Sequence, residues 1–217
     1  MLREVNASLY SENRKSKLNI LLNVIIAVIA VVLVAEIMFA INYSGIYVVG
    51  SSMYPTLNGA ESEDSPGGDY VYVNKHSKPD YGDIVVVFRN SDTTIIKRAV
   101  AFGGDYVRID RGQLQIKYSG TDEFVDVEEN YVASENNTPD LPKNNFHNDE
   151  NGYYVEEGYF FLLGDNRDVS EDSRSRGSFK MTNLYGVVVN WSMKNKSFIS
   201  SVHEYFYFDI PRFFGLR

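Results

Sequence analysis

The chain has 217 residues, a formal net charge of −8 and no cysteine. The absence of cysteine excludes disulfides, thiolate metal ligands and a cysteine nucleophile. The acidic balance argues against nucleic acid as a partner, because phosphate binding needs clustered Lys and Arg. The length suits one domain with an appendage, and the 16 Tyr, 13 Phe and 16 Gly favour strands and turns over helices.

Residues 18–41 form an apolar segment that three polar residues interrupt. At about 1.5 Å per residue it is long enough to cross a hydrocarbon core of roughly 30 Å with some tilt. The segment exceeds the apolar run of a cleaved signal peptide, and no A-x-A pattern stands near its end, so we expect an uncleaved signal anchor. Basic residues precede it and none follows directly. This bias predicts a single span with residues 1–17 in the cytoplasm and 42–217 outside.

Beyond the anchor, short apolar runs between Gly- and Asp-rich turns predict a mainly β domain. We expect a hairpin around Arg111 and Gly112, an acidic loop at residues 58–69, and a long polar excursion at 119–158 with one short strand. The expected strands are 46–49, 70–73, 84–88, 93–100, 106–109, 114–118, 159–163 and 185–191.

Ser52 lies in a turn-forming cluster, and a serine in such a place is ordinarily a loop residue. A Ser-His-Asp triad is disfavoured, because the three histidines lie in polar or tail segments away from any strand end with a carboxylate. They are His76, His147 and His203. The G-x-S-x-G and H-E-x-x-H motifs are absent, which argues against an α/β hydrolase and against a zinc protease.

A Ser-Lys dyad is the remaining hydrolytic option. Lysine acts as a general base only when its pKa falls well below about 10.4, and burial among apolar groups lowers it by penalising the charged form. Lys97 suits this role because isoleucine, alanine and valine surround it in a strand-like run. The residues around Lys97 are also compatible with an exposed charge on an edge strand.

Four segments resemble, in order, the sequence boxes of bacterial type I signal peptidases. Residues 52–57 are similar to the S-M-x-P-T-L box, 82–85 to the following G-D box, and 97–100 to the lysine box. Residues 164–174 match the G-D-N-x-x-x-S-x-D-S-R box nearly residue for residue. The boxes stand behind an anchor and cover most of the chain, which resembles the compact, Gram-positive-like members.

The resemblance implies antiparallel sheets and a membrane-bound serine endopeptidase without cofactor or metal. Its substrates would be preproteins bearing N-terminal signal peptides, cleaved at the outer face of the plasma membrane, with membrane lipid and the secretion translocon nearby. Ser52 would be the nucleophile, and Lys97 the base that returns the proton to the leaving amine. In supporting roles, Ser170 would orient Lys97, and Asp172 would pair with Arg174. Asp165 and Arg167 would hold residues 164–174, here called the polar box, in shape.

The resemblance also implies small pockets that select Ala-x-Ala before the cleaved bond. The residues expected to form them are Val48, Gly50, Met53, Leu57 and Ile96.

The chain departs from the family's pattern near the nucleophile. Gly50 stands where some members carry a serine whose hydroxyl completes the oxyanion hole, so only the Ser52 N–H is assigned as a donor. Residues 58–69 look like an insertion at the pocket edge. Gly103 stands where proline is frequent.

A rival interpretation is a non-catalytic, membrane-anchored extracellular β domain, an inactive relative of the family. The joint presence of Ser52, Lys97, Ser170 and Asp172 favours the enzyme, since a binding module has no physical reason to keep the four together. A self-cleaving Ser-Lys repressor is disfavoured by the anchor and by the lack of a basic DNA-binding segment.

Overall fold

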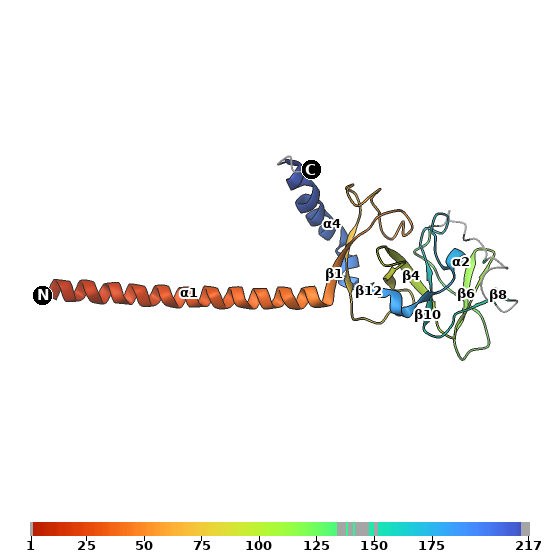
Figure 1. The fold of residues 1–217 in the computed structure, drawn as a ribbon, viewed down its shortest axis with the longest axis horizontal. Helices are drawn as coiled ribbons and strands as arrows, with labels where there is room; N and C mark the ends of the chain where they lie inside the picture. The colour runs from red at the N-terminus through yellow and green to blue at the C-terminus, as the bar shows by residue number, and fades with distance from the viewer. Residues whose placement is uncertain (1, 134–137, 139–140, 142–147, 150–151, 214–217) are drawn as a thin grey trace. The chain divides into compact units, whose positions relative to one another are not determined.

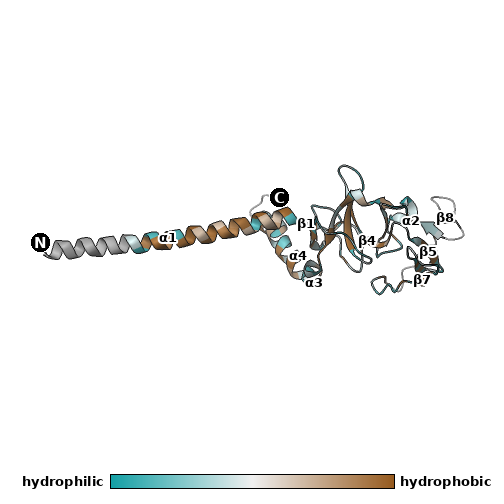
Figure 2. Cartoon of the chain, turned by 90° about the horizontal axis from the view of Figure 1, so that it is seen from below, coloured by the Kyte–Doolittle hydropathy of each residue, from teal (hydrophilic) through white to brown (hydrophobic). Residues whose placement is uncertain are grey.

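The computed structural model describes residues 2–133, 138, 141, 148–149 and 152–213, with side-chain detail from residue 16. The chain divides into two compact units, Met1–Tyr43 and Ser44–Arg217. The first unit is essentially one helix, α1 (Leu2–Asn42). Figure 2 shows brown, hydrophobic residues along most of its coloured length. Within it, Ser16–Asn42 is long and apolar enough to cross a membrane, which agrees with the expected apolar segment at 18–41.

The second unit contains a seven-stranded sheet whose described strand pairs are antiparallel. Its central strands β3, β4 and β10 are buried apolar runs, and Figure 1 shows β4 and β10 in the body of this unit. In order across the sheet, the strands are β1 (Tyr43–Tyr47), β2 (Tyr70–Asn74), β12 (Leu184–Val188), β3 (Ile84–Phe88), β4 (Thr94–Phe102), β10 (Tyr159–Leu163) and β11 (Phe179–Lys180).

The sequence of β3 is a continuous apolar run and lacks the alternation of polar and apolar residues that is typical of a strand with one exposed face. Side chains point alternately to the two faces of a strand. Ile84 and Val86 enter one core cluster, and Val85 and Val87 enter another on the opposite face. Both faces of the sheet are covered at this strand, so every position in it except the last is apolar and buried.

A second sheet of five strands completes the β structure. The expected hairpin is present, and its turn residues Arg111 and Gly112 have φ angles of 49° and 84°, the positive values of a two-residue hairpin turn. Across this sheet the strands are β7 (Val125–Asp126), β6 (Gln113–Lys117), β5 (Tyr106–Asp110), β9 (Gly152–Tyr154) and β8 (Asn148–Asp149).

The expectation of one short strand in residues 119–158 is wrong, because β7, β8 and β9 all lie there. These strands have two or three residues, too few to show a period of two in the sequence.

The expected strand at 185–191 is too long, since β12 ends at Val188 and a helix begins at Asn190. The helices of the second unit were not predicted from the sequence. The second unit holds α2 (Ser173–Arg176), η1 (Met181–Asn183), α3 (Asn190–Lys194), α4 (Lys196–Glu204), the π-helical turn η2 (Tyr205–Asp209) and α5 (Ile210–Phe213). Figure 1 shows the C-terminal helices in dark blue.

Candidate active site

Ser52 and Lys97 meet although 45 positions separate them in the chain. Ser52 lies in the turn that follows β1, and Lys97 lies in β4. Lys97 Nζ donates a hydrogen bond to Ser52 Oγ at 2.7 Å and a second to the carbonyl oxygen of Ile96 at 2.9 Å. A nucleophile within hydrogen-bond reach of a base is the geometry that nucleophilic catalysis requires.

The surroundings of Lys97 favour its neutral form. The residue is 4% exposed, and this burial lowers the pKa of Lys97 from 10.5 to about 8. The carboxylates of Asp172 and Asp165 act in the opposite direction, because negative charge favours the ammonium. Desolvation outweighs them, so a substantial share of the amine is neutral at mildly alkaline pH.

Two residues that the sequence did not single out fix the loop that carries Ser52. The backbone N–H of Asn166 donates to the carbonyl of Ser52 at 3.0 Å, and its side-chain amide donates to the carbonyl of Ser51 at 3.1 Å. The Thr56 hydroxyl donates to the Asp165 carboxylate. Both residues lie in the quoted boxes, which was the only signal that pointed to them.

Asp172 and Arg174 form a two-point ion pair. Arg174 Nε lies 2.9 Å from Asp172 Oδ1, and Nη2 lies 3.0 Å from Oδ2. The same carboxylate accepts from the backbone N–H of Gly164 at 3.0 Å and caps helix α2 by accepting from the Arg174 N–H. Asp172 therefore joins the end of β10 to α2 beneath the site.

Asp165 and Arg167 each bind a residue outside the polar box. Arg98 Nε donates to Asp165 Oδ1 at 2.8 Å, next to Lys97 in β4. Arg167, whose side chain is fully buried, donates to both carboxylate oxygens of Glu129 and to the Gly164 carbonyl. The partner roles of Arg98 and Glu129 were not predicted from the sequence, since they depend on which segments meet in the fold.

Ser170 does not make the expected contact. Among the described residues, its buried hydroxyl oxygen has no hydrogen-bond partner, while Lys97 bonds to Ser52 and to Ile96. The Ser170 side chain packs instead over Gly164, where a Cβ would lie 2.1 Å from its Oγ. The orienting role of Ser170 stays a prediction.

The expected pocket residues gather in one place. Val48, Met53, Leu57 and Ile96 belong to a single buried cluster that lies on the sheet face formed by β2 and β3. They form an apolar floor near the dyad and are closed to solvent in this state. Gly50 is exposed, and its φ of 79° favours glycine over serine at this position.

The acidic loop at residues 58–69 runs along the segment that precedes the nucleophile. Gly50 N–H donates to the Ala60 carbonyl, Ala60 N–H donates to the Val48 carbonyl, and Val49 pairs with Ala60 in a parallel bridge. Because Gly50 already donates to Ala60, its N–H does not supply the second oxyanion donor in this state.

Residues 19–192 match the family described as signal peptidase, peptidase S26, and they make up most of the chain. The chain belongs to the signal peptidase S26 family. Signal peptidase I S of Bacillus subtilis is 33% identical over 174 residues, covering 76% of this chain and 84% of the relative. Signal peptidase I of Streptococcus pneumoniae is 30% identical over 171 residues, covering 66% and 79%.

A solved signal peptidase I structure from Enterococcus faecalis matches with 29% identity and a TM-score of 0.42, covering 52% of this chain and 98% of that one. Membership of the S26 family makes the inactive β domain the less favoured interpretation.

Two of the histidines considered for a triad can be followed further. His203 stacks on Tyr47 and Tyr70, while His147 lies outside the described residues.

Proposed function

We propose that this protein is a membrane-bound serine endopeptidase that cleaves signal peptides from preproteins, with Ser52 as nucleophile and Lys97 as general base. The observation that carries the proposal is the 2.7 Å contact between Lys97 Nζ and Ser52 Oγ. The burial of Lys97 supports its role as general base, because a fully solvated lysine would be charged and unable to accept a proton at neutral pH.

In the reactive form the neutral amine accepts the proton of Ser52 Oγ as that oxygen attacks the scissile carbonyl carbon. The carbonyl oxygen becomes an oxyanion, for which the Ser52 N–H is the assigned donor, and each such donor contributes on the order of 10²–10³ in rate. The Lys97 ammonium then protonates the leaving amine as the peptide bond breaks. Lys97 next removes a proton from the water that hydrolyses the acyl-enzyme ester, and it returns this proton to Ser52.

The charges around the dyad suit this cycle. Asp165 and Asp172 both lie close enough to raise the pKa of Lys97, so they stabilise the ammonium that forms as Ser52 attacks. Arg98 and Arg174 bind these carboxylates directly and hold them in place. The network therefore permits Lys97 to gain a proton without fixing it permanently in the charged state.

The finer assignments belong to the same proposal. Helix α1 would cross the plasma membrane once, with lipid around it and the N-terminus in the cytoplasm. Residues 42–217 would then face the outside, where preproteins leave the secretion translocon. An extended signal peptide would reach the floor formed by Val48, Met53, Leu57 and Ile96, where a local opening would admit small side chains.

The test is cleavage of a preprotein whose signal peptide ends in Ala-x-Ala by the full-length protein in lipid vesicles. Mass spectrometry of the products is expected to place the cut directly after the second alanine. The Ser52→Ala variant is expected to yield no product, and replacing that alanine of the substrate by Phe is expected to block cleavage by the unaltered enzyme. The same product from Ser52→Ala at a similar rate would refute the proposal.

A further inference from the structure

Three exposed charged side chains meet beside the dyad and have no part in the proposed chemistry. Arg89 follows β3, and its Nη2 lies 3.2 Å from Oε2 of Glu171 in the polar box. Arg176 of α2 donates to the other oxygen of the same carboxylate. We call these three residues the charged rim. The side chains of Arg89 and Arg176 are 38% and 37% exposed, so much of each guanidinium faces solvent.

The charged rim has an excess of positive charge. One carboxylate shared by two guanidinium groups leaves it with a net charge of +1, in a chain whose formal net charge is −8. Within the described residues, neither guanidinium has a second side-chain partner. Each guanidinium carries five N–H donors, whose spacing matches a carboxylate. The rim can therefore bind one further carboxylate.

The charged rim lies within electrostatic reach of Lys97. Arg89 lowers the pKa of Lys97, and Glu171 raises it. Salt limits the interaction of exposed charges to about 8–10 Å, a length that about three residues of extended chain cover. A polypeptide cut at the dyad would therefore reach the rim within about three residues of the cut.

Neighbouring residues of β4 separate the two halves of the substrate. Side chains point alternately to the two faces of a strand. Ile96 pairs with Val86 and belongs to the apolar floor, whereas Lys97 pairs with Val85 and starts from the opposite face. In the proposed reaction the Lys97 ammonium protonates the leaving amine. The signal peptide therefore lies over the floor, and the mature polypeptide departs on the Lys97 side.

Arg89 belongs to the face from which Lys97 starts. The ladder between β3 and β4 continues beyond β3, since the backbone N–H of Arg89 donates to the carbonyl of Thr93 at 2.8 Å. Steps of two residues from Val85 through Val87 bring Arg89 to the same face as Lys97. The charged rim is therefore on the leaving-group side of the dyad.

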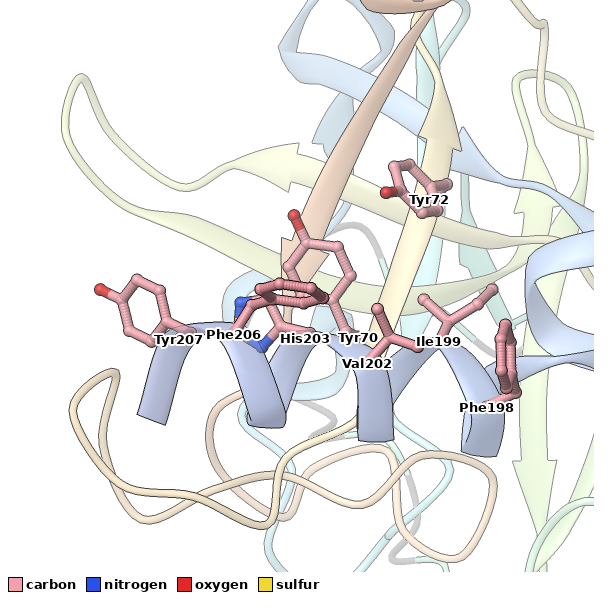
Figure 3. Close-up of a pocket in the computed structure, with 8 residues that line it drawn as sticks. All are labelled: Tyr70, Tyr72, Phe198, Ile199, Val202, His203, Phe206 and Tyr207. Carbon is pink, nitrogen blue, oxygen red and sulfur yellow. The ribbon is translucent and has the colours of Figure 1, made fainter. Parts of the chain in front are cut away.

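Helix α4 covers a different part of this face, at β2. Val71 and Val73 belong to the cluster that forms the floor, so Tyr70 and Tyr72 point to the opposite face. Figure 3 shows both tyrosines with the side chains of α4, with which they line a groove. Strand β12 separates β2 from β3. The face is thus covered by α4 at β2 and exposed at the charged rim.

We propose that Arg89 and Arg176 bind an acidic side chain among the first three residues after the cut, and so favour preproteins whose mature part begins with Asp or Glu. The inference rests on the proposed function, because it assigns a substrate subsite of that same enzyme. Glu171 would compete with the substrate carboxylate for the two arginines.

The test compares three preproteins that differ only at the second and third residues after the cut, which are Glu-Glu, Gln-Gln or Lys-Lys. The full-length protein cleaves them in phosphatidylcholine vesicles, whose zero net charge leaves substrate binding to the lipid equal, and kcat/KM is measured. We expect Glu-Glu to be cleaved about tenfold faster than Lys-Lys, since attraction and repulsion by exposed charges each change the rate a few-fold. The same pairs placed about ten residues after the cut, beyond the reach of the rim, are expected to give equal rates.

Variants of the rim are expected to change this ratio in opposite directions. Arg89→Glu and Arg176→Glu would each remove or reverse the preference, whereas Glu171→Gln would strengthen it a few-fold by removing the competing carboxylate. A change in the pKa of Lys97 affects both substrates alike and leaves their ratio unaltered. Arg111→Glu makes the same charge change in the exposed hairpin turn of the second sheet and is the matched control, with an unchanged ratio expected.

Equal rates for the three preproteins, or an unchanged ratio in both Arg89→Glu and Arg176→Glu, would overturn the proposal. An equal change of the ratio in Arg111→Glu would assign the preference to the overall charge of the protein, with the same consequence. Cleavage at the expected bond without a charge preference would refute this inference alone. Failure to cleave any of the three preproteins would refute the proposed function, and this inference with it.

Discussion

At the scale of single residues, the proposed catalysis depends on how β4 buries Lys97 beside Ser52. The strand places the amine among apolar side chains, where the loss of hydration outweighs the attraction of Asp165 and Asp172. In the proposed mechanism the residue is a base because of its position in the sheet, and its protonation would control the activity.

The first prediction concerns pH. In the proposed mechanism the neutral amine is the active form. Activity is therefore expected to rise about tenfold per pH unit below the pKa of Lys97, which is about 8, and to level off above it. The measurement is kcat/KM for a signal-peptide substrate from pH 6 to 9.5. A flat profile across this range would contradict the role of Lys97.

The second prediction concerns Asp172, whose carboxylate raises the pKa of Lys97. Asp172→Asn removes that charge and is expected to move the pH midpoint of activity downward. Glu171→Gln, at an exposed site with the same sign of effect, is expected to give a smaller downward shift if Asp172→Asn fails to fold. Asp168→Asn serves as the control with no shift. A midpoint that stays or rises in folded Asp172→Asn and Glu171→Gln would refute the electrostatic argument.

At the scale of elements, the junction between β10 and the polar box is tightly packed. A Cβ on Gly164 would lie 2.1 Å from Ser170 Oγ and 2.5 Å from the Ser52 carbonyl oxygen. Since contacts this short force the serine loop to move, Gly164→Ala is expected to lower the cleavage rate by about 100-fold or more, the loss that small displacements of catalytic groups cause.

Gly158→Ala is the matched control for Gly164→Ala. Gly158 has open space around it but a φ of 80°, so the substitution introduces strain of roughly 1–2 kcal/mol without touching the site. It is expected to lower the melting temperature and leave kcat unchanged. Normal cleavage by Gly164→Ala would contradict this prediction, because it would show that the loop carrying Ser52 tolerates displacement.

The sequence predicted some elements closely and missed others for identifiable reasons. The strands at 84–88 and 159–163 were predicted with the observed bounds, because their apolar runs are buried on both faces. The C-terminal helices were missed because their Tyr and Phe residues suggest strands, and the π-helical turn at Tyr205–Asp209 breaks the helical period. The apolar neighbours of Lys97 suggested a buried lysine, but its assignment as the base depended on the resemblance of residues 97–100 to the lysine box.

The sequence did not predict which side chains of the site bind one another. Glu129 binds Arg167 from a polar excursion that has no periodic pattern, and Arg98 of β4 binds Asp165 in the segment that follows β10. Such pairs are set by the meeting of distant segments, about which a single sequence carries no local signal. The motif boxes supplied the residues of the site but not the contacts between them.

At the scale of the whole molecule, the orientation in the membrane is open to a direct test. The chain has no cysteine, so single cysteines report accessibility without background. With the N-terminus in the cytoplasm, a membrane-impermeant maleimide is expected to label Ser91→Cys on intact cells, and Ser11→Cys only after permeabilisation. Labelling of Ser11→Cys on intact cells would reverse the proposed orientation.

The central claim is that Ser52 and Lys97 act as one catalytic unit. Its most direct test is the rate of preprotein cleavage by Ser52→Ala, by Lys97→Met and by the double variant, all in lipid vesicles. Groups that act together are not additive, so each single variant is expected to lose on the order of 10³-fold or more, and the double variant no more than either. Near-normal cleavage by Lys97→Met, or a loss in the double variant equal to the product of the two single losses, would contradict the account.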